Sequence, residues 1–283
     1  MLAARPRDGT DTGTGTEGRN TMAGSQPYRV VAYNTAQNSE NKIHDDAVAR
    51  RFGFTGGLVP GVDVYAYMTH PAVARWGRAW LERGTAECRF AQPVYDGDPA
   101  IIAATEDASS LTLTVESHGA VCATGQATLP AAPPPADHFA APPSPPVTRP
   151  AADETSLAVG TLLGMRPLAI TAAFAAQYLD DVRETDPLYR REGLAHPGLI
   201  LRTCNWALSH NVVLGPWMHV GSIVRHLGVA GVGDELSVRA RVDANYERKG
   251  HRFVELEALV LANADRPLAR IRHVAIYRPR QVG

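Results

Sequence analysis

The residues best suited to acid–base chemistry lie in one short stretch near the start of the chain. This stretch includes Ser39, Glu40, Asn41 and His44 in close succession. An unperturbed imidazole titrates near neutral pH, so His44 can both accept and release a proton under ordinary conditions. Ser39 cannot act as a base unaided, because its hydroxyl needs a base of its own.

A purely structural interpretation of His44 stays open beside this one. The imidazole would then be hydrogen-bonded locally at the start of a helix, with Asn41 or Ser39 as the cap. Asp45 and Asp46 follow directly, and acids in a first helical turn are favoured by the helix dipole.

The chain contains two Pro-Gly turns that each open a long apolar run. Pro60-Gly61 leads into an apolar stretch that reaches Met68, and Pro197-Gly198 leads into one that reaches Leu208. Proline fits the first turn of a helix, where its missing N–H is not needed. Glycine lets another group approach the backbone closely. We therefore expect two central helices that begin at equivalent turns.

Similar strands follow each predicted helix. The segment 87–98 matches 223–234, and both end in Gly-Asp. Alternating strands come next, and the turns at 248–250 and 263–265 are typical of hairpins. Each half therefore predicts one buried helix followed by an antiparallel meander, and two such sheets can join edge to edge.

Two low-complexity segments set the expected domain limits. Residues 1–26 are rich in Gly and Thr, which predicts a disordered leader, and Met22 is an alternative start. Nine of the prolines lie between 130 and 150, which predicts an extended linker over 130–155. The two folded halves would then span 27–129 and 156–283.

Composition excludes several classes of protein. The net charge of −1 argues against nucleic-acid binding through bulk positive charge. No apolar run is long enough to span a bilayer, and no apolar signal core follows the first residues. Three widely spaced cysteines indicate neither a disulfide framework nor a metal cluster, so we expect a cytoplasmic protein. The histidines at 196, 219 and 251 lack metal-ligand spacing.

The stretch at 39–44 resembles the signature of the MaoC-like, (R)-specific enoyl-thioester hydratases. That signature reads roughly Asp-x-Asn-Pro-Ile-His, followed by Gly-Phe and by a His-Gly turn into the central helix. Asn41, Ile43 and His44 are in register with it, and Gly53-Phe54 and Gly61 follow. The resemblance implies an α+β, double hot-dog fold, in which two sheets are each wrapped around a central helix.

The signature is degenerate at several positions. Ser39 stands where the family has aspartate, Lys42 where it has proline, and Pro60 where it has the histidine before the turn. Glu40 places a carboxylate one residue away. In the second half the matching stretch begins at Glu184, and Tyr189 replaces the histidine.

The resemblance implies reversible hydration of a 2-enoyl thioester, or dehydration of a 3-hydroxyacyl thioester. His44 would be the acid and base, with Asn41 orienting the water or the ring and Glu40 or Ser39 as second contact. The backbone amide of Gly61, after Pro60, would polarise the thioester carbonyl. In the second half, Gly198 would be its counterpart and Tyr189 part of a replacement site.

Other functions remain open at this point. Some hot-dog thioesterases carry a catalytic acid on the central helix, and Asp63 stands there in this sequence. A non-catalytic acyl-binding or partner subunit, or a specialised biosynthetic lyase or cyclase, would also fit the broken motif. The same resemblance implies an acyl-CoA or acyl-carrier-protein substrate and no metal or redox cofactor. We expect no nucleic-acid or membrane partner, and a homodimer of double hot-dog chains stays open.

Overall fold

The computed structural model describes residues 26–135 and 139–280 of the chain. Within them, eleven strands form one continuous sheet with the order β1-β3-β4-β5-β2-β8-β11-β10-β9-β6, and β7 pairs with β9. The predicted leader at 1–26, including Met22, lies outside the described residues apart from Gln26.

The first half supplies five strands and three α-helices. Its elements in chain order are β1 (Tyr28–Val31), the 3₁₀ turn η1 (Lys42–His44), α1 (Asp46–Arg50), α2 (Gly61–Trp76), α3 (Arg78–Arg83), β2 (Thr85–Phe90), β3 (Pro99–Asp107), β4 (Ser110–Ser117) and β5 (Ala120–Thr128).

The second half repeats this plan with additional helices before its central one. Its elements are β6 (Leu162–Leu163), β7 (Leu168–Ala169), α4 (Ala172–Asp181), α5 (Pro187–Glu192), α6 (Pro197–Ser209), β8 (Met218–His226), β9 (Glu235–Arg248), β10 (His251–Ala262) and β11 (Arg266–Arg278).

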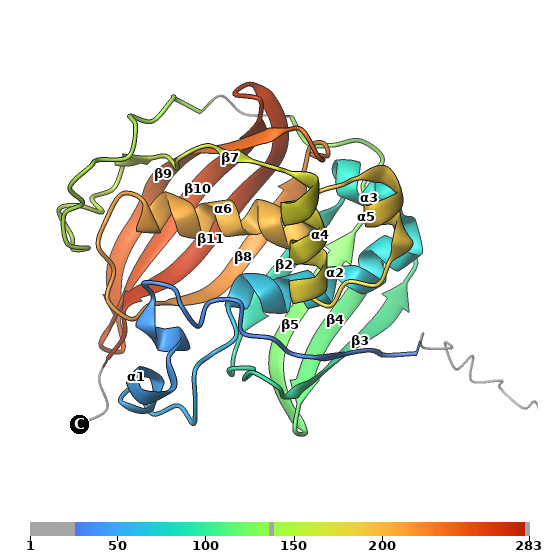
Figure 1. The fold of residues 1–283 in the computed structure, drawn as a ribbon, viewed down its shortest axis with the longest axis horizontal. Helices are drawn as coiled ribbons and strands as arrows, with labels where there is room; N and C mark the ends of the chain where they lie inside the picture. Colours follow the sequence, from blue (N-terminus) through green and yellow to red (C-terminus); the bar gives the residue numbers. More distant parts are fainter. Residues whose placement is uncertain (1–25, 136–138, 281–283) are drawn as a thin grey trace, which may run out of the picture.

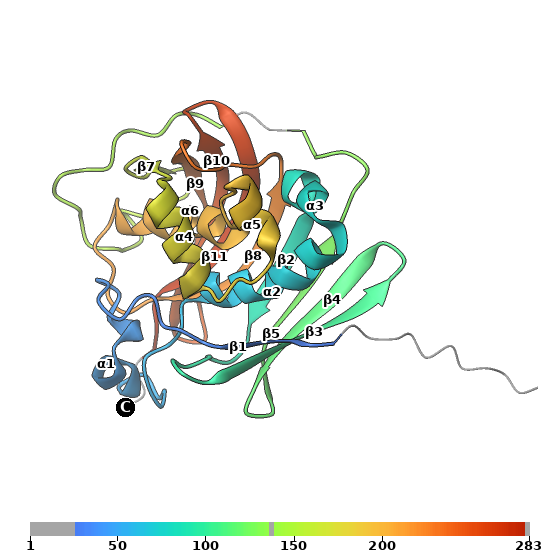
Figure 2. The ribbon, with the colours of Figure 1, turned by 45° about the vertical axis from the view of Figure 1, so that its right-hand side comes forward.

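Each half is a curved antiparallel sheet wrapped around one long helix, as the sequence predicts. Figure 1 shows α2 and α6 lying together in front of the strands, and the turned view in Figure 2 shows the sheet of the first half curving past α2. Buried and exposed residues alternate along strands such as β4 and β9. This alternation directs one side chain of every two toward the helices.

The two halves join through β2 and β8, which pair antiparallel. Glu87 and Ile223, which begin the two matching segments in the sequence, lie directly opposite each other across this junction. The repeat is therefore arranged around a local two-fold relationship, and one unbroken sheet covers both central helices.

Both central helices begin at the predicted Pro-Gly turns. α2 starts at Gly61 with Pro60 as its N-cap, and α6 starts at Pro197 with His196 as its N-cap. The hairpins at Lys249-Gly250 and Asn263-Ala264 are also confirmed, since these residues have the positive φ angles that tight turns require.

The proline-rich segment follows an extended path without helix or strand over its described residues. Its C-terminal end is hydrogen-bonded to the second half: Arg149 donates to the Ser209 carbonyl, and the Ala152 N–H donates to the Val213 carbonyl. Over the described ranges, no helix is long and apolar enough to cross a membrane.

Candidate active site

Two adjoining cavities open beside His44, at the boundary between the halves. One has a volume of about 410 Å³ and the other of about 310 Å³. Five residues line both of them, and we call this shared region the junction: Asn41, His44, Pro60, Asn205 and Trp217.

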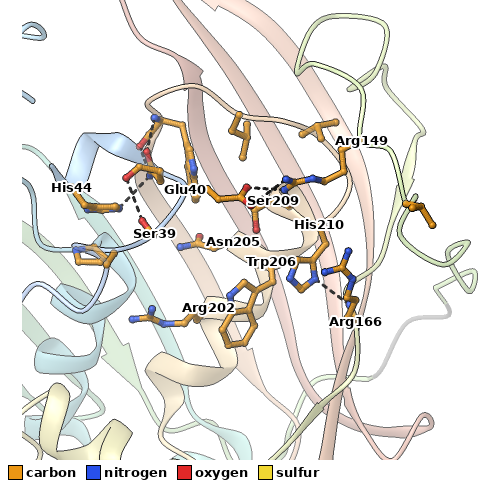
Figure 3. A pocket seen from close by; sticks show the side chains of 17 residues that line it. Ser39, Glu40, His44, Arg149, Arg166, Arg202, Asn205, Trp206, Ser209 and His210 are labelled. Carbon is orange, nitrogen blue, oxygen red and sulfur yellow. Dashed lines mark hydrogen bonds and ion pairs between the residues drawn. The ribbon is translucent and has the colours of Figure 1, made fainter. Parts of the chain in front are cut away.

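The larger cavity, here called the polar cavity, carries most of the charge. Beyond the junction its polar and charged lining residues are Ser39, Glu40, Arg149, Arg166, Arg202, Ser209 and His210. Figure 3 shows these side chains converging from the His44 loop (residues 39–44), the proline-rich segment, the connection between β6 and β7, and α6 up to its C-terminal end. Three arginines line this space. Arg149 pairs with Glu40 and Arg202 with Asp63, so Arg166 is the arginine best placed to attract a phosphorylated or carboxylated ligand.

The smaller cavity, here called the apolar slot, has mainly hydrophobic walls. They come from both halves and include Ile43, Phe54, Leu58, Val59, Val64, Phe90, Val94, Met218, Val220 and Ile276. Gly61 and His219 also line it. The polar cavity and the slot meet at the junction, so a ligand with a charged end and an apolar end fits across them.

His44 lies at the junction with a defined ring orientation. Its Nδ1 is 2.6 Å from the carbonyl oxygen of Leu58, and a carbonyl can only accept, so Nδ1 carries the proton. Nε2 is then the basic nitrogen, and it lies 3.2 Å from Nδ2 of Asn41. Burial lowers the pKa of His44, although the Leu58 carbonyl partly opposes this shift. The imidazole is therefore neutral near pH 7 and available as a base.

Asn41 connects the His44 loop to the second half. Its Oδ1 accepts from the backbone N–H groups of Trp217 and Ile43, at 3.1 and 3.3 Å. Its Nδ2 donates to the Trp217 carbonyl at 3.0 Å and to His44. All four hydrogen-bonding positions of the carboxamide are used, and one of them contacts the His44 ring.

Glu40 does not form the expected pair with His44. Its two carboxylate oxygens accept from Arg149 at 2.9 and 3.2 Å, and this contact lowers the pKa of Glu40. The expectation failed because Arg149 lies in the proline-rich segment, far away in sequence. Ser39 lines the polar cavity, and its hydroxyl lies 3.3 Å from the Asn41 carbonyl. Among the described residues, no carboxylate is hydrogen-bonded to His44.

The amide of Gly61 is available at the wall of the slot. No side chain in the described structure caps the start of α2, and Gly61 and Pro60 both line the slot. A methyl group at position 61 would lie 2.9 Å from Nδ1 of His219 and 3.2 Å from the Phe90 ring. Glycine is needed here because these two rings approach the backbone so closely.

The amide of Gly198 is not available, which corrects the expectation that it matches Gly61. It donates to Nδ1 of His196 at 3.1 Å, and a methyl group on Gly198 would lie 2.6 Å from the Tyr178 hydroxyl. The start of α6 is thus capped and covered.

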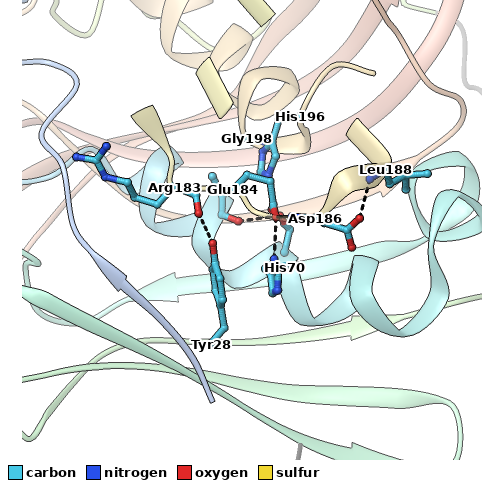
Figure 4. Close-up of polar contacts among 10 residues, drawn as sticks. Tyr28, His70, Arg183, Glu184, Asp186, Leu188, His196 and Gly198 are labelled. Carbon is cyan, nitrogen blue, oxygen red and sulfur yellow. Dashed lines mark hydrogen bonds and ion pairs between the residues drawn. The ribbon is translucent and has the colours of Figure 1, made fainter. Parts of the chain in front are cut away.

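The second-half stretch forms a closed polar cluster. The Glu184 carboxylate lies 2.8 Å from Nδ1 of His70 and 3.2 Å from Nε2 of His196, as Figure 4 shows. Glu184 is buried, which disfavours its charge, but the two histidines and the Asp186 amide hold the pKa of Glu184 well below its usual range. Tyr189 is wholly buried beside His196, and its hydroxyl has no partner among the described residues. Tyr189 is therefore a core residue in this structure.

Asp63 lies between the two central helices and lines neither cavity. Its buried carboxylate pairs with Arg202 of α6 and accepts from the Thr35 hydroxyl at 2.7 Å. These contacts keep the carboxylate away from a ligand in the slot, which speaks against the thioesterase interpretation.

A buried chain of polar groups begins at His219, in the wall of the slot. His219 Nε2 lies 2.8 Å from the Ser222 hydroxyl, and that hydroxyl lies 3.0 Å from Nδ1 of His273. Burial and the neighbouring His273 hold the pKa of His219 well below its usual range, so the ring is neutral. Its Nδ1 has no hydrogen-bond partner in the described part of the chain.

Sequence reasoning missed the contributions from distant segments. Asn205 and Trp217 complete the junction, and Arg149, Arg166 and His210 line the polar cavity. One usable signal was Asn205 itself, because it interrupts the apolar run of the second central helix. Arg149, Arg166 and His210 lie outside that run, and nothing in their spacing marks them as part of a site.

Comparisons with known proteins bear on the fold. No protein-family model matches the sequence, and no curated protein does so either. Among solved structures, one described as a MaoC domain dehydratase from Chloroflexus aurantiacus aligns with a TM-score of 0.64 at 12% identity, covering 91% of this chain and 95% of that one. A conserved Mycobacterium tuberculosis protein with a double hot-dog fold aligns with a TM-score of 0.58 at 16% identity, covering 89% and 96%.

A third structure, a MaoC-like dehydratase, gives a TM-score of 0.55 at 14% identity and covers 89% of this chain and 96% of that one. Nearly the whole length of each protein is matched. The fold is a double hot-dog. Identities this low establish the architecture alone, so the reaction has to be argued from the site.

Proposed function

We propose that the protein catalyses the reversible dehydration of a 3-hydroxyacyl thioester to a 2-enoyl thioester. The observation that carries this proposal is the position of a neutral His44, with its basic nitrogen at the junction of a charged cavity and an apolar slot. The uncapped start of α2 at Gly61 lines the same slot.

His44 can perform both proton transfers of a syn elimination. Nε2 takes the proton from C2, and the electrons of that C–H bond form the C2=C3 double bond as the C3–O bond breaks. The same nitrogen then gives its proton to the departing hydroxide, which leaves as water. The substrate must displace the contact between Asn41 Nδ2 and His44, which at 3.2 Å lies at the upper end of the normal hydrogen-bond range. Hydration is the reverse sequence.

The Gly61 amide would stabilise the charge that develops on the thioester oxygen. Removal of the C2 proton places negative charge on that oxygen, and an N–H at a helix start is well suited to receive it. The acyl chain would lie in the apolar slot, and the phosphate-bearing part of coenzyme A or a carrier arm would lie near Arg149, Arg166 and His210.

Crotonyl-CoA and longer 2-enoyl-CoA thioesters test the proposal directly. We expect the enone absorbance to fall as water adds, and His44→Ala to slow this by roughly 10²–10⁴-fold, the usual contribution of a general base. His118→Ala is the control, because His118 is exposed and pairs with Asp98. If no thioester gains water, or if His44→Ala reacts at the wild-type rate, the proposal fails.

A non-catalytic acyl-binding protein is the second candidate. It is favoured by the serine at the position of the family's acid and by the engagement of Glu40 with Arg149. Tight binding of butyryl-CoA together with no turnover of any 2-enoyl thioester would support this candidate against the first.

A further inference from the structure

Asn205 brings a polar side chain from the second half into the site of the first half. It lies on α6, two turns after Gly198, and it lines both the polar cavity and the apolar slot. Figure 3 shows its carboxamide directed from α6 toward the side of the cavity where His44 lies.

The carboxamide of Asn205 has no partner within the described part of the protein. Among residues 26–135 and 139–280, its buried Oδ1 finds no hydrogen-bond donor and its Nδ2 finds no acceptor. Other amides nearby are hydrogen-bonded: Asn41 makes four hydrogen bonds, and Asn211, just after α6, donates to the Gly164 and Ala207 carbonyls. A buried polar group without a hydrogen-bond partner lowers the stability of the folded protein. A ligand group that binds there can supply the missing partner.

The internal repeat shows that helix packing does not require an amide at this position. When the two helices are aligned at Gly61 and Gly198, Asn205 corresponds to Met68 of α2. Met68 is wholly buried and lies against Gly125. An apolar side chain therefore serves at the equivalent core position, and the polar one occurs on the helix that faces His44.

We propose that Asn205 is a substrate-binding residue that holds the C3 hydroxyl of the acyl chain, or the attacking water, opposite His44. A carboxamide can donate to a hydroxyl oxygen and accept from its O–H at the same time. It cannot take up a proton at neutral pH, so the proton transfer stays with His44. This assignment rests on the proposed reaction and narrows the ligand to acyl groups that carry a hydroxyl at C3.

The experiment compares two unreactive thioethers, S-(3-hydroxybutyl)-CoA and S-butyl-CoA, which differ by one hydroxyl. They lack the thioester carbonyl and cannot undergo elimination. By calorimetry we expect the wild-type protein to bind the hydroxylated compound ~3–10-fold more tightly, the gain from one or two net hydrogen bonds. Asn205→Leu should lose this preference and bind S-butyl-CoA as the wild type does.

Asn211→Ala is the matched control. It removes an amide that lies just after the same helix, outside both cavities, so it should lower stability and leave the preference unchanged. Equal wild-type affinities for the two compounds, or a preference that survives in Asn205→Leu, would overturn the role of Asn205.

The same measurement separates this inference from the proposed reaction. A hydroxyl preference that depends on Asn205, in a protein that converts no thioester, would support the binding role and refute the dehydratase. Turnover of thioesters without any such preference would refute the binding role alone.

As a second readout, Asn205→Asp should add an ionisable acid opposite His44 and introduce a new acidic limb in the pH profile of turnover.

Discussion

Nδ2 of Asn41 donates to Nε2 of His44 across 3.2 Å, and the same carboxamide holds both backbone groups of Trp217. One side chain therefore orients the candidate base and ties its loop to the other half of the protein. This relationship makes the charge state of His44 sensitive to the chemistry at position 41.

Replacing Asn41 by aspartate should raise the pKa of His44. A carboxylate cannot donate to Nε2, but it can accept from a protonated imidazole, and an adjacent negative charge favours the protonated form. We expect a rise of roughly one unit or more in an NMR titration of the His44 ring. Asn41→Ala, which adds no charge, is the comparison, and equal titration curves for both variants would contradict the prediction.

Ser39→Asp should raise turnover by restoring the acid of the degenerate signature. A carboxylate sharing a water with His44 would divide the two proton transfers between two groups, and we expect kcat to rise by ~10-fold or more. Ser39→Asn has nearly the same size and no charge. If the two variants react with 2-enoyl thioesters at the same rate, a carboxylate at position 39 does not reach the reacting atoms.

Gly61→Ala should impair both stability and turnover. The added methyl group would lie 2.9 Å from His219 Nδ1 and 3.2 Å from Phe90, and overpacking of this kind costs ~1–3 kcal/mol. Gly215→Ala is the control, since a methyl group there would contact none of the described residues within 4 Å, and we expect the free energy of unfolding to change by no more than about 0.5 kcal/mol. Urea unfolding of both variants measures these changes in the free energy of unfolding. If the two variants are equally stable, the rings of His219 and Phe90 move aside without cost and the prediction is wrong.

Stability should fall once the pH drops below about 6.5. Burial lowers the pKa of His226 to about 4 and that of His273 to about 3, while an unfolded histidine titrates near 6.5. The unfolded state therefore binds protons that the folded state excludes, so the stabilising contribution is complete above pH 6.5 and declines below it. A pKa difference of one unit corresponds to about 1.36 kcal/mol. Each such histidine should therefore lower the free energy of unfolding by roughly 1.5–2 kcal/mol between pH 7 and pH 5.

Urea unfolding between pH 7.5 and 5 checks this behaviour. The variant His226→Leu removes one of the titrating groups, whose ring lies against Trp80, and its stability should depend less steeply on pH than that of the wild type. A wild-type stability that stays constant down to pH 5 would contradict the assignment of these rings as buried and neutral.

Arg166→Ala should weaken binding of a phosphorylated carrier and leave the acyl site intact. The side chain lines the polar cavity, so we expect KM for a 2-enoyl-CoA to rise ~5–10-fold, the effect of losing a charge-assisted contact. The N-acetylcysteamine thioester of the same acid has no phosphate and serves as the control substrate. If KM rises equally for both substrates, Arg166 does not act through the phosphates of the carrier, and the prediction is wrong.

Local patterns in the sequence were sufficient for much of the fold. The two Pro-Gly turns marked the starts of α2 and α6, and the glycine-containing turns marked the hairpins of the second half. These features depend on the φ angles and periodicity of neighbouring residues, so they can be recognised without tertiary information. The same holds for His44 and Asn41, whose spacing of three residues brings them together in one turn.

The sequence by itself determined that two similar helix-and-sheet units exist and that the first carries an imidazole with an asparagine beside it. Tertiary structure alone decided the partners of those residues. Glu40 faces Arg149, Gly198 is capped by His196, and Asn205 reaches the site from the other half. The physical reason is that burial and hydrogen bonding between distant segments depend on how the two units pack, and no local spacing encodes that packing.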